Sequence, residues 1–131
     1  MVGESRKPHE NLPGHAVKRD GYVEIHIDES LLCSKAEEEC VEAIKAVAKH
    51  FAANRLMLVC EDHENANSIA DAWRIGTRVA DEAKGMRLCV LLRGRSVRSL
   101  DRFVEMVAAN RGGSIRYFEN EEEARRWIKS P

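Results

Sequence analysis

Two short segments made only of apolar residues constrain the fold more than any other feature of this sequence. Residues 56–60 read Leu-Met-Leu-Val-Cys, and residues 88–92 read Leu-Cys-Val-Leu-Leu. Strands that are apolar at every position are typical of the middle of a sheet whose two faces are both covered. The chain between them has helical spacing from about residue 66 to 84, and buried strands joined by a helix form a parallel pair. The sequence therefore predicts an α/β fold.

The chain before these strands predicts a β-hairpin. Asp20-Gly21 separates two strand-like segments, and glycine adopts at little cost the positive φ that tight turns require. In the second segment apolar and polar residues alternate, so we expect one buried face and one face in water. The expected buried residues are Val23, Ile25 and Ile27, and the expected wet ones are Glu24, His26 and Asp28.

Three further helices and one further strand complete the expected order. The helices cover about 34–51, a segment capped by Ser96 or Ser99, and a short segment capped by Asn120; the strand covers 114–118. The helix over 66–84 is expected to turn inward Ile69, Ala72, Trp73, Gly76, Ala80 and Ala83. The predicted architecture is a hairpin followed by α-β-α-β-α-β-α, with a mostly parallel mixed sheet and helices packed on it.

Length and composition bound the class of protein. The 131 residues predict one domain over 14–131, after a flexible lead-in over 1–13. A net charge of −1 argues against a general nucleic-acid binder, and no apolar run reaches the ~20 residues of a membrane span. The N-terminal residues lack the apolar core of a signal peptide, so we expect a cytoplasmic protein.

The four cysteines form no Cys-x-x-Cys pair, which favours small buried side chains over disulfides or zinc ligands.

The end of the chain carries a family resemblance. Residues 115–128 read Ile-Arg-Tyr-Phe-Glu-Asn-Glu-Glu-Glu-Ala-Arg-Arg-Trp-Ile, a strand closing on Phe followed by an acidic cap, Ala and Trp-aliphatic. With the order of elements over roughly 14–129, this resembles the STAS domain, and most of all its SpoIIAA-like group, whose topology is related to that of lipid-binding domains. The resemblance implies a non-catalytic regulatory or protein-interaction module. The Asp-Ser/Thr-Ser-Gly phosphorylation motif of the antagonists is missing from residues 60–68, so their partner switching is not carried over.

The first candidate site follows the strand at 56–60. Glu61, Asp62, His63 and Glu64 offer three carboxylates and an imidazole, a set that suits a divalent cation or a general base. Acidic residues also collect before helices, because the positive end of the helix dipole favours them. Adjacent residues cannot all point at one ion, so we expect no metal site here. Ser68, with Asp71 three residues later, fits a helix cap better than a phosphorylation site.

The second candidate site follows the strand at 88–92. Arg93, Gly94, Arg95 and Ser96 lead into a helix and offer guanidinium groups for an anion or an acidic partner. Because carboxyl ends of parallel strands meet at one edge of a sheet, this loop should neighbour Glu61 and Asp62 and form ion pairs with them.

Three functions stay open at this point. The first is a STAS-like regulatory or interaction module that binds a protein partner or a second copy of itself, with Glu61–Ser68 and Arg93–Ser96 as its working surface. The second is a carrier of a small apolar or anionic ligand, suggested by surplus apolar residues on two helices: Trp73, Ile75, Val79, Met106 and Ala109. The third is an enzyme that uses His63 with Glu61 or Asp62. We expect no cofactor, because neither phosphate-binding glycine motif occurs in the sequence.

Overall fold

The computed structural model describes residues 15–27, 34–61 and 68–131. It contains a five-stranded mixed sheet in the order β1-β2-β3-β4-β5, so each strand lies beside the strand that precedes it in the chain. The strands are β1 (His15–Arg19), β2 (Tyr22–Ile27), β3 (Arg55–Glu61), β4 (Arg87–Arg93) and β5 (Ile115–Phe118). The α/β fold predicted from the sequence is confirmed.

The hairpin forms where the Asp20-Gly21 pair predicts it. β1 and β2 are antiparallel, Arg19 faces Tyr22 across the turn, and Gly21 has a φ of +91°. The other neighbouring strands are all parallel, and their connections are the helices α2 (Ser34–Phe51), α3 (Ile69–Glu82) and α4 (Ser99–Asn110). Such crossovers are almost always right-handed, so three successive steps in one direction along the sheet put all three helices on the same face.

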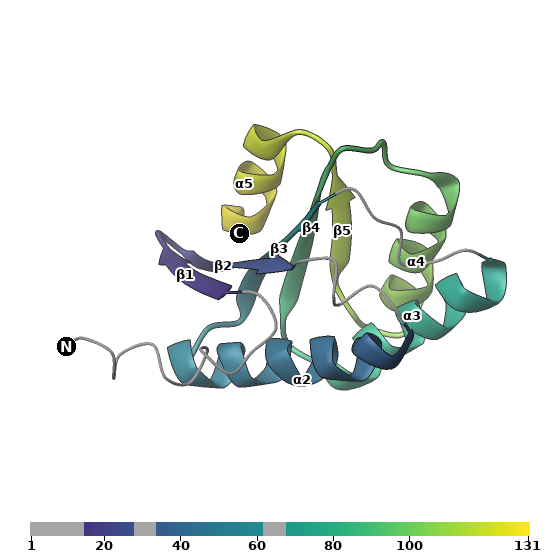
Figure 1. Ribbon diagram of the computed structural model, residues 1–131, viewed down its shortest axis with the longest axis horizontal. Coiled ribbons are helices and arrows are strands. Elements are labelled where there is room, and N and C mark those ends of the chain that lie inside the picture. Colours follow the sequence, from purple (N-terminus) through teal and green to yellow (C-terminus); the bar gives the residue numbers. More distant parts are fainter. Residues whose placement is uncertain (1–14, 28–33, 62–67) are drawn as a thin grey trace.

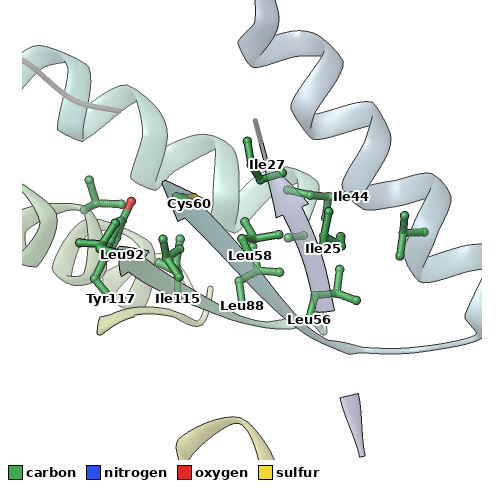
Figure 2. Close-up of a cluster of buried hydrophobic side chains, with 14 of the residues drawn as sticks. Ile25, Ile27, Ile44, Leu56, Leu58, Cys60, Leu88, Leu92, Ile115 and Tyr117 are labelled. Atoms are coloured by element: carbon green, nitrogen blue, oxygen red, sulfur yellow. The ribbon is translucent and has the colours of Figure 1, made fainter. Parts of the chain in front are cut away.

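The larger core lies between the sheet and these three helices. Figure 2 shows Ile25 and Ile27 of β2 beside Ile44 of α2, with side chains of β3, β4 and β5 continuing the same layer, and α3 and α4 contribute further residues. The buried members from the helices are Ile44, Val47, Ala72, Ala83, Val104 and Ala108. This core removes most of the apolar surface of the central strands from water, which is the main favourable term in folding.

The opposite face of the sheet is covered by α5 (Glu121–Lys129) (Figure 1). Ala124 and Ile128 of α5 pack on Met57, Val59, Cys89 and Leu91, with Trp127 and Phe118 beside them. Two covered faces explain why β3 and β4 are apolar at every central position. Asn120 caps α5 as predicted, because its side chain accepts a hydrogen bond from the backbone nitrogen of Glu123.

Several predicted details are wrong. Ile69 and Trp73 of α3 are 67% and 49% exposed, whereas Ala72, Gly76, Ala80 and Ala83 do face inward. α3 begins three residues later than expected. Its buried stripe is narrow, because α4 lies so close to Gly76 that only small residues of α3 fit at the contact. α4 starts after Arg98, and neither Ser96 nor Ser99 is its cap.

The expectation that one face of β2 lies in water is also wrong. Tyr22 and Glu24 on that face are 5% and 6% exposed, and His26 is partly buried. The helix α5 covers this side of the sheet, and a local alternation of polar and apolar residues carries no information about a helix that follows about a hundred residues later.

Candidate functional site

The carboxyl edge of the sheet brings the two predicted loops together. Glu61 ends β3, Arg93 ends β4, and the two residues are direct partners in the parallel register. The Nη1 atom of Arg93 lies 3.5 Å from Oε2 of Glu61, as the sequence predicted for this pair of loops. The Nη2 atom of Arg93 lies 3.1 Å from Oε1 of Glu121 at the start of α5. One guanidinium therefore bridges carboxylates from β3 and α5.

The contacts continue along α5. Glu121 also pairs with Arg125 one turn later in the helix, and the nearby Tyr22 side chain of β2 is the largest cause that raises the pKa of Arg125. We name Glu61, Arg93, Glu121 and Arg125 the charged row. All four side chains are between about two-fifths and three-fifths exposed, so the row runs over the surface from the carboxyl edge toward the hairpin.

Arg95 has a different role from the anion-binding one that its position suggested. Its guanidinium binds the Asp101 carboxylate through two hydrogen bonds of 2.9 and 3.2 Å, and the Arg95 side chain is only 11% exposed. Asp101 also accepts a hydrogen bond from the backbone nitrogen of Arg98, which closes the start of α4. Arg95 therefore fixes the loop after β4 to α4. Ser96 is exposed, and its carbonyl accepts a hydrogen bond from Arg95.

Ser68 caps α3, because its hydroxyl accepts a hydrogen bond from the backbone nitrogen of Asp71 at 3.1 Å. Asp62 and His63 lie outside the described residues, as does the rest of their loop through residue 67. The cation-binding and enzymatic interpretations of that loop therefore stay predictions. Within the described ranges, no three His, Cys, Asp or Glu side chains gather closely enough to hold a metal ion.

A second polar cluster, which the sequence did not predict, lies on the hairpin of β1 and β2, at the end of the charged row that Arg125 forms. Its centre is the buried Glu24, whose two carboxylate oxygens contact Nε of Arg19 at 3.1 Å and Nε2 of His26 at 2.6 Å. Burial alone would raise the pKa of Glu24, but the hydrogen bonds from Arg19 and His26 outweigh it and hold that pKa below its usual value. The same contact raises the pKa of Arg19, so the pair stays charged.

One signal for this cluster was present in the sequence. Tyr22, Glu24 and His26 alternate along one face of β2, and Arg19 faces Tyr22 across a turn that the sequence predicts correctly. No local pattern could add Arg125, because it comes from α5 and reaches the hairpin only through the packing of that helix.

The amino edge of the sheet has its own arginines, and they serve the fold. Arg55 donates to the carbonyls of Ile128 and Ser130, and Arg87 donates to those of Trp127 and Ser130, at 2.6 to 2.9 Å. The carbonyl of Trp127 also accepts from the backbone nitrogen of Ser130, so the two arginines bind the last turn of α5 and the residue that caps it. A shallow hollow of about 300 Å³ lies beside the two arginines, between the loops after α3 and α4.

Two cysteines of the central strands are buried. Cys60 and Cys89 are both free thiols, and burial raises the pKa of Cys89 to about 12. A thiol with so high a pKa is not a nucleophile at neutral pH. No helix of the described segments is both long enough and apolar enough to cross a bilayer.

No family model, curated protein or solved structure matches this chain. The site must therefore be interpreted from its own geometry.

Proposed function

We propose that this protein is a non-catalytic regulatory or protein-interaction module with a STAS-like build, and that the charged row is part of its working surface. The observation that carries the proposal is Arg93, a half-exposed guanidinium between Glu61 and Glu121 at the carboxyl edge of the sheet. In open α/β sheets this is the edge at which ligands and partners bind. The order of elements and the closing residues 115–128, on which the STAS resemblance rests, support the kind of module proposed.

The ion pairs of the row suit a surface that exchanges partners. Exposed pairs of this kind contribute only about 0–1 kcal/mol each, because water and salt screen them. A partner that presents its own carboxylate to Arg93, or a basic group to Glu61, replaces such pairs at little cost. The buried ion pair of Arg95 and Asp101 keeps the loop after β4 fixed to α4 while the surface pairs exchange.

The proposal includes a protein partner or a second copy of the chain, and a cytoplasmic location. Free buried thiols such as Cys60 and Cys89 support a reducing compartment. The carrier hypothesis gains little, because Ile75 and Val79, two of the surplus apolar residues of α3, pack against the core.

Charge reversal at Arg93 tests the proposal. We expect Arg93→Glu to lose most of the protein partners that the tagged wild-type protein captures from an extract of its source cells. Arg74→Glu is the matched control, because Arg74 is equally exposed and forms an ion pair with Asp71, but lies on α3. Quantitative mass spectrometry compares the captured sets, and light scattering measures the oligomeric state of all three proteins.

Two outcomes would reject the charged row as the working surface. One is an unchanged set of partners and an unchanged oligomeric state in Arg93→Glu. The other is an equal loss in the Arg74→Glu control, which would indicate a general effect of charge.

A further inference from the structure

Positive charge is concentrated at the amino edge of the sheet, opposite the charged row. This edge is formed by the segments that join α2, α3 and α4 to the strands that follow them, residues 52–55, 83–87 and 111–116. These segments contain no Asp or Glu, although the whole chain has a net charge of −1. Their basic residues are Arg55, Lys84, Arg87, Arg111 and Arg116.

A hollow of about 300 Å³ opens between these segments, and we name it the amino-edge hollow. Its lining includes Asn54, Arg55, Gly85, Arg87, Gly112 and Ser114. A Cβ atom built on Gly85 or Gly112 would meet no atom within 4 Å, so the space beside both glycines is open. The volume lies at the lower end of the range for small-molecule sites, and no aromatic side chain of the described residues lines the hollow. It therefore suits a small polar ligand.

The nearby acidic residues lie outside the hollow. Glu82, in the last turn of α3, pairs with Lys45 at 3.0 Å. Asp81 precedes it on the same helix, and Asp20 lies in the hairpin turn before β2. None of these three acids lines the hollow.

Arg55 has hydrogen-bond donors to spare. Its Nη1 atom donates to the carbonyls of Ile128 and Ser130, and this contact holds the end of α5. Its Nε and Nη2 atoms have no partner among the described residues, and neither is one of the polar atoms that are buried without a hydrogen bond, so solvent reaches both. Nε and Nη2 point from the same side of the guanidinium plane, which is the arrangement that binds two oxygens of one anion.

Two neutral side chains of the hollow are also without a hydrogen bond to the described residues. Asn54 and Ser114 offer an amide and a hydroxyl, and both groups donate to anionic oxygens. Arg87 adds its charge, although its two Nη atoms are already bound to the residues at the end of α5.

The helix ends at this edge oppose an anion. α2, α3 and α4 all end here, and the C-terminus of a helix carries a partial negative charge. Part of the basic excess therefore stabilises these helix ends. An anion in the hollow depends on the side-chain cations alone, so its binding should be sensitive to each of them.

We propose that the amino-edge hollow binds a phosphate group, either free or carried by a small metabolite, and that Arg55 is its main ligand. The free side of the Arg55 guanidinium holds two phosphate oxygens, and Asn54 and Ser114 supply further donors. Lys84 and Arg87 raise the local positive potential. The hollow lies at the opposite edge of the sheet from the charged row, so it does not depend on the function proposed above.

The test uses the full chain, isotope-labelled for NMR, and two probes, glycerol 3-phosphate and inorganic phosphate. We expect the probes to shift the amide signals of Gly85, Gly112 and Ser114 and the Nε signal of Arg55, and to bind more weakly as sodium chloride is added. Tighter binding of glycerol 3-phosphate supports a phosphorylated metabolite, and tighter binding of inorganic phosphate supports the free ion. Glycerol is the neutral control and should shift none of these signals.

Two variants test the cations. Arg55→Lys keeps the charge and a donor for the carbonyls of α5 but loses the two-pronged side, and we expect it to weaken phosphate binding by about tenfold or more. Lys84→Glu reverses a charge at the rim of the hollow and should weaken binding similarly. Arg74→Glu makes the same change of charge near the other end of α3 and should leave binding unchanged. Circular dichroism verifies folding, and Lys84→Glu carries the test if Arg55→Lys does not fold.

The proposal is overturned if neither phosphate probe shifts these signals, or if glycerol shifts them equally. Shifts that lie at the carboxyl edge around Arg93 would also overturn it, as would an Arg74→Glu variant that binds as weakly as Lys84→Glu.

Discussion

At the scale of single residues, the buried charged side chains give the sharpest predictions about the stability of the fold. Glu24 and Asp101 are the two buried acidic residues of the described chain, at 6% and 1% exposure, and each binds an arginine. A buried carboxylate is stable only with such partners, and removal of one member leaves the other without compensation. The two sites differ in what they join: Glu24 connects β1 and β2 beneath α5, and Asp101 connects the loop after β4 to α4.

Glu24 predicts a pH-dependent stability. Its pKa is lowered in the folded protein because hydrogen bonds from Arg19 and His26 outweigh the effect of burial. Its contribution is therefore present above the ordinary carboxylate pKa and is lost as the pH falls through the lowered one. We expect Glu24→Gln to cost about 1–3 kcal/mol in urea unfolding at neutral pH.

The difference between Glu24→Gln and wild type should shrink as the unfolding series is moved to acidic pH. Glu122→Gln, which changes an exposed carboxylate of α5, is the control and should have little effect. A difference that stays constant from neutral to acidic pH would contradict the account of Glu24.

Removal of the Asp101 carboxylate should destabilise the protein far more than removal of a carboxylate that pairs at the surface. Asp101→Ala leaves the guanidinium of Arg95 mostly buried without its carboxylate, and we expect a cost of about 3–5 kcal/mol in denaturant unfolding. Glu82→Ala breaks an exposed pair with Lys45 and should have a much smaller effect, because water screens that pair. Equal effects of the two substitutions would show that the Arg95–Asp101 pair is not buried in solution.

At the scale of elements, the contact between α3 and α4 depends on small residues. A Cβ atom on Gly76 would lie 2.8 Å from Cβ of Val107 and 2.9 Å from the carbonyl oxygen of Val104. Because one of these neighbours is backbone, the clash cannot be relieved by a side-chain rotation alone, and the helices would have to separate.

We therefore expect Gly76→Ala to destabilise the protein by about 1 kcal/mol. Overpacking costs about 1–3 kcal/mol, and the better helix propensity of alanine offsets about 1 kcal/mol of it. Thermal unfolding measures the change. Asp81→Ala, at an exposed position of the same helix, should stay within about 0.5 kcal/mol of wild type. A Gly76→Ala protein more stable than wild type would mean that α3 and α4 lie farther apart.

The elements themselves were largely predictable from the sequence. Continuous apolar segments predict β3 and β4, and Asp20-Gly21 predicts the hairpin, because these signals are local. Ser68 and Asp71 predict the cap of α3 correctly, whereas the predicted inner face was too wide, and Ile69 and Trp73 lie outside the buried stripe. Gly76 identifies the helix face that is truly buried, since only glycine allows the approach of α4.

At the scale of the whole molecule, the common direction of the three crossovers determines which charged side chains meet at the surface. Three successive crossovers place α2, α3 and α4 on one face of the sheet, and among the described elements α5 covers the other (Figure 1). The start of α5 then reaches Arg93 at the carboxyl edge, and the rest of its polar face reaches the hairpin. The charged row is a product of this arrangement.

The candidate site was predicted in part for the same reason. The rule that strand ends meet at one edge predicts the contact of Glu61 and Arg93. Glu121 was absent from the prediction, since its place depends on where α5 packs. Arg95 was assigned to an anion, whereas its partner Asp101 lies six residues later inside the start of α4.

The most direct test of the central claim, that the carboxyl edge and α5 form the working surface, is NMR mapping of a captured partner on the isotope-labelled protein. The account predicts that the perturbed amides cluster at Glu61, Arg93 and Glu121 and that Arg93→Glu removes the perturbation. Perturbations confined to the exposed side of α3 around Trp73, and unchanged by Arg93→Glu, would contradict it.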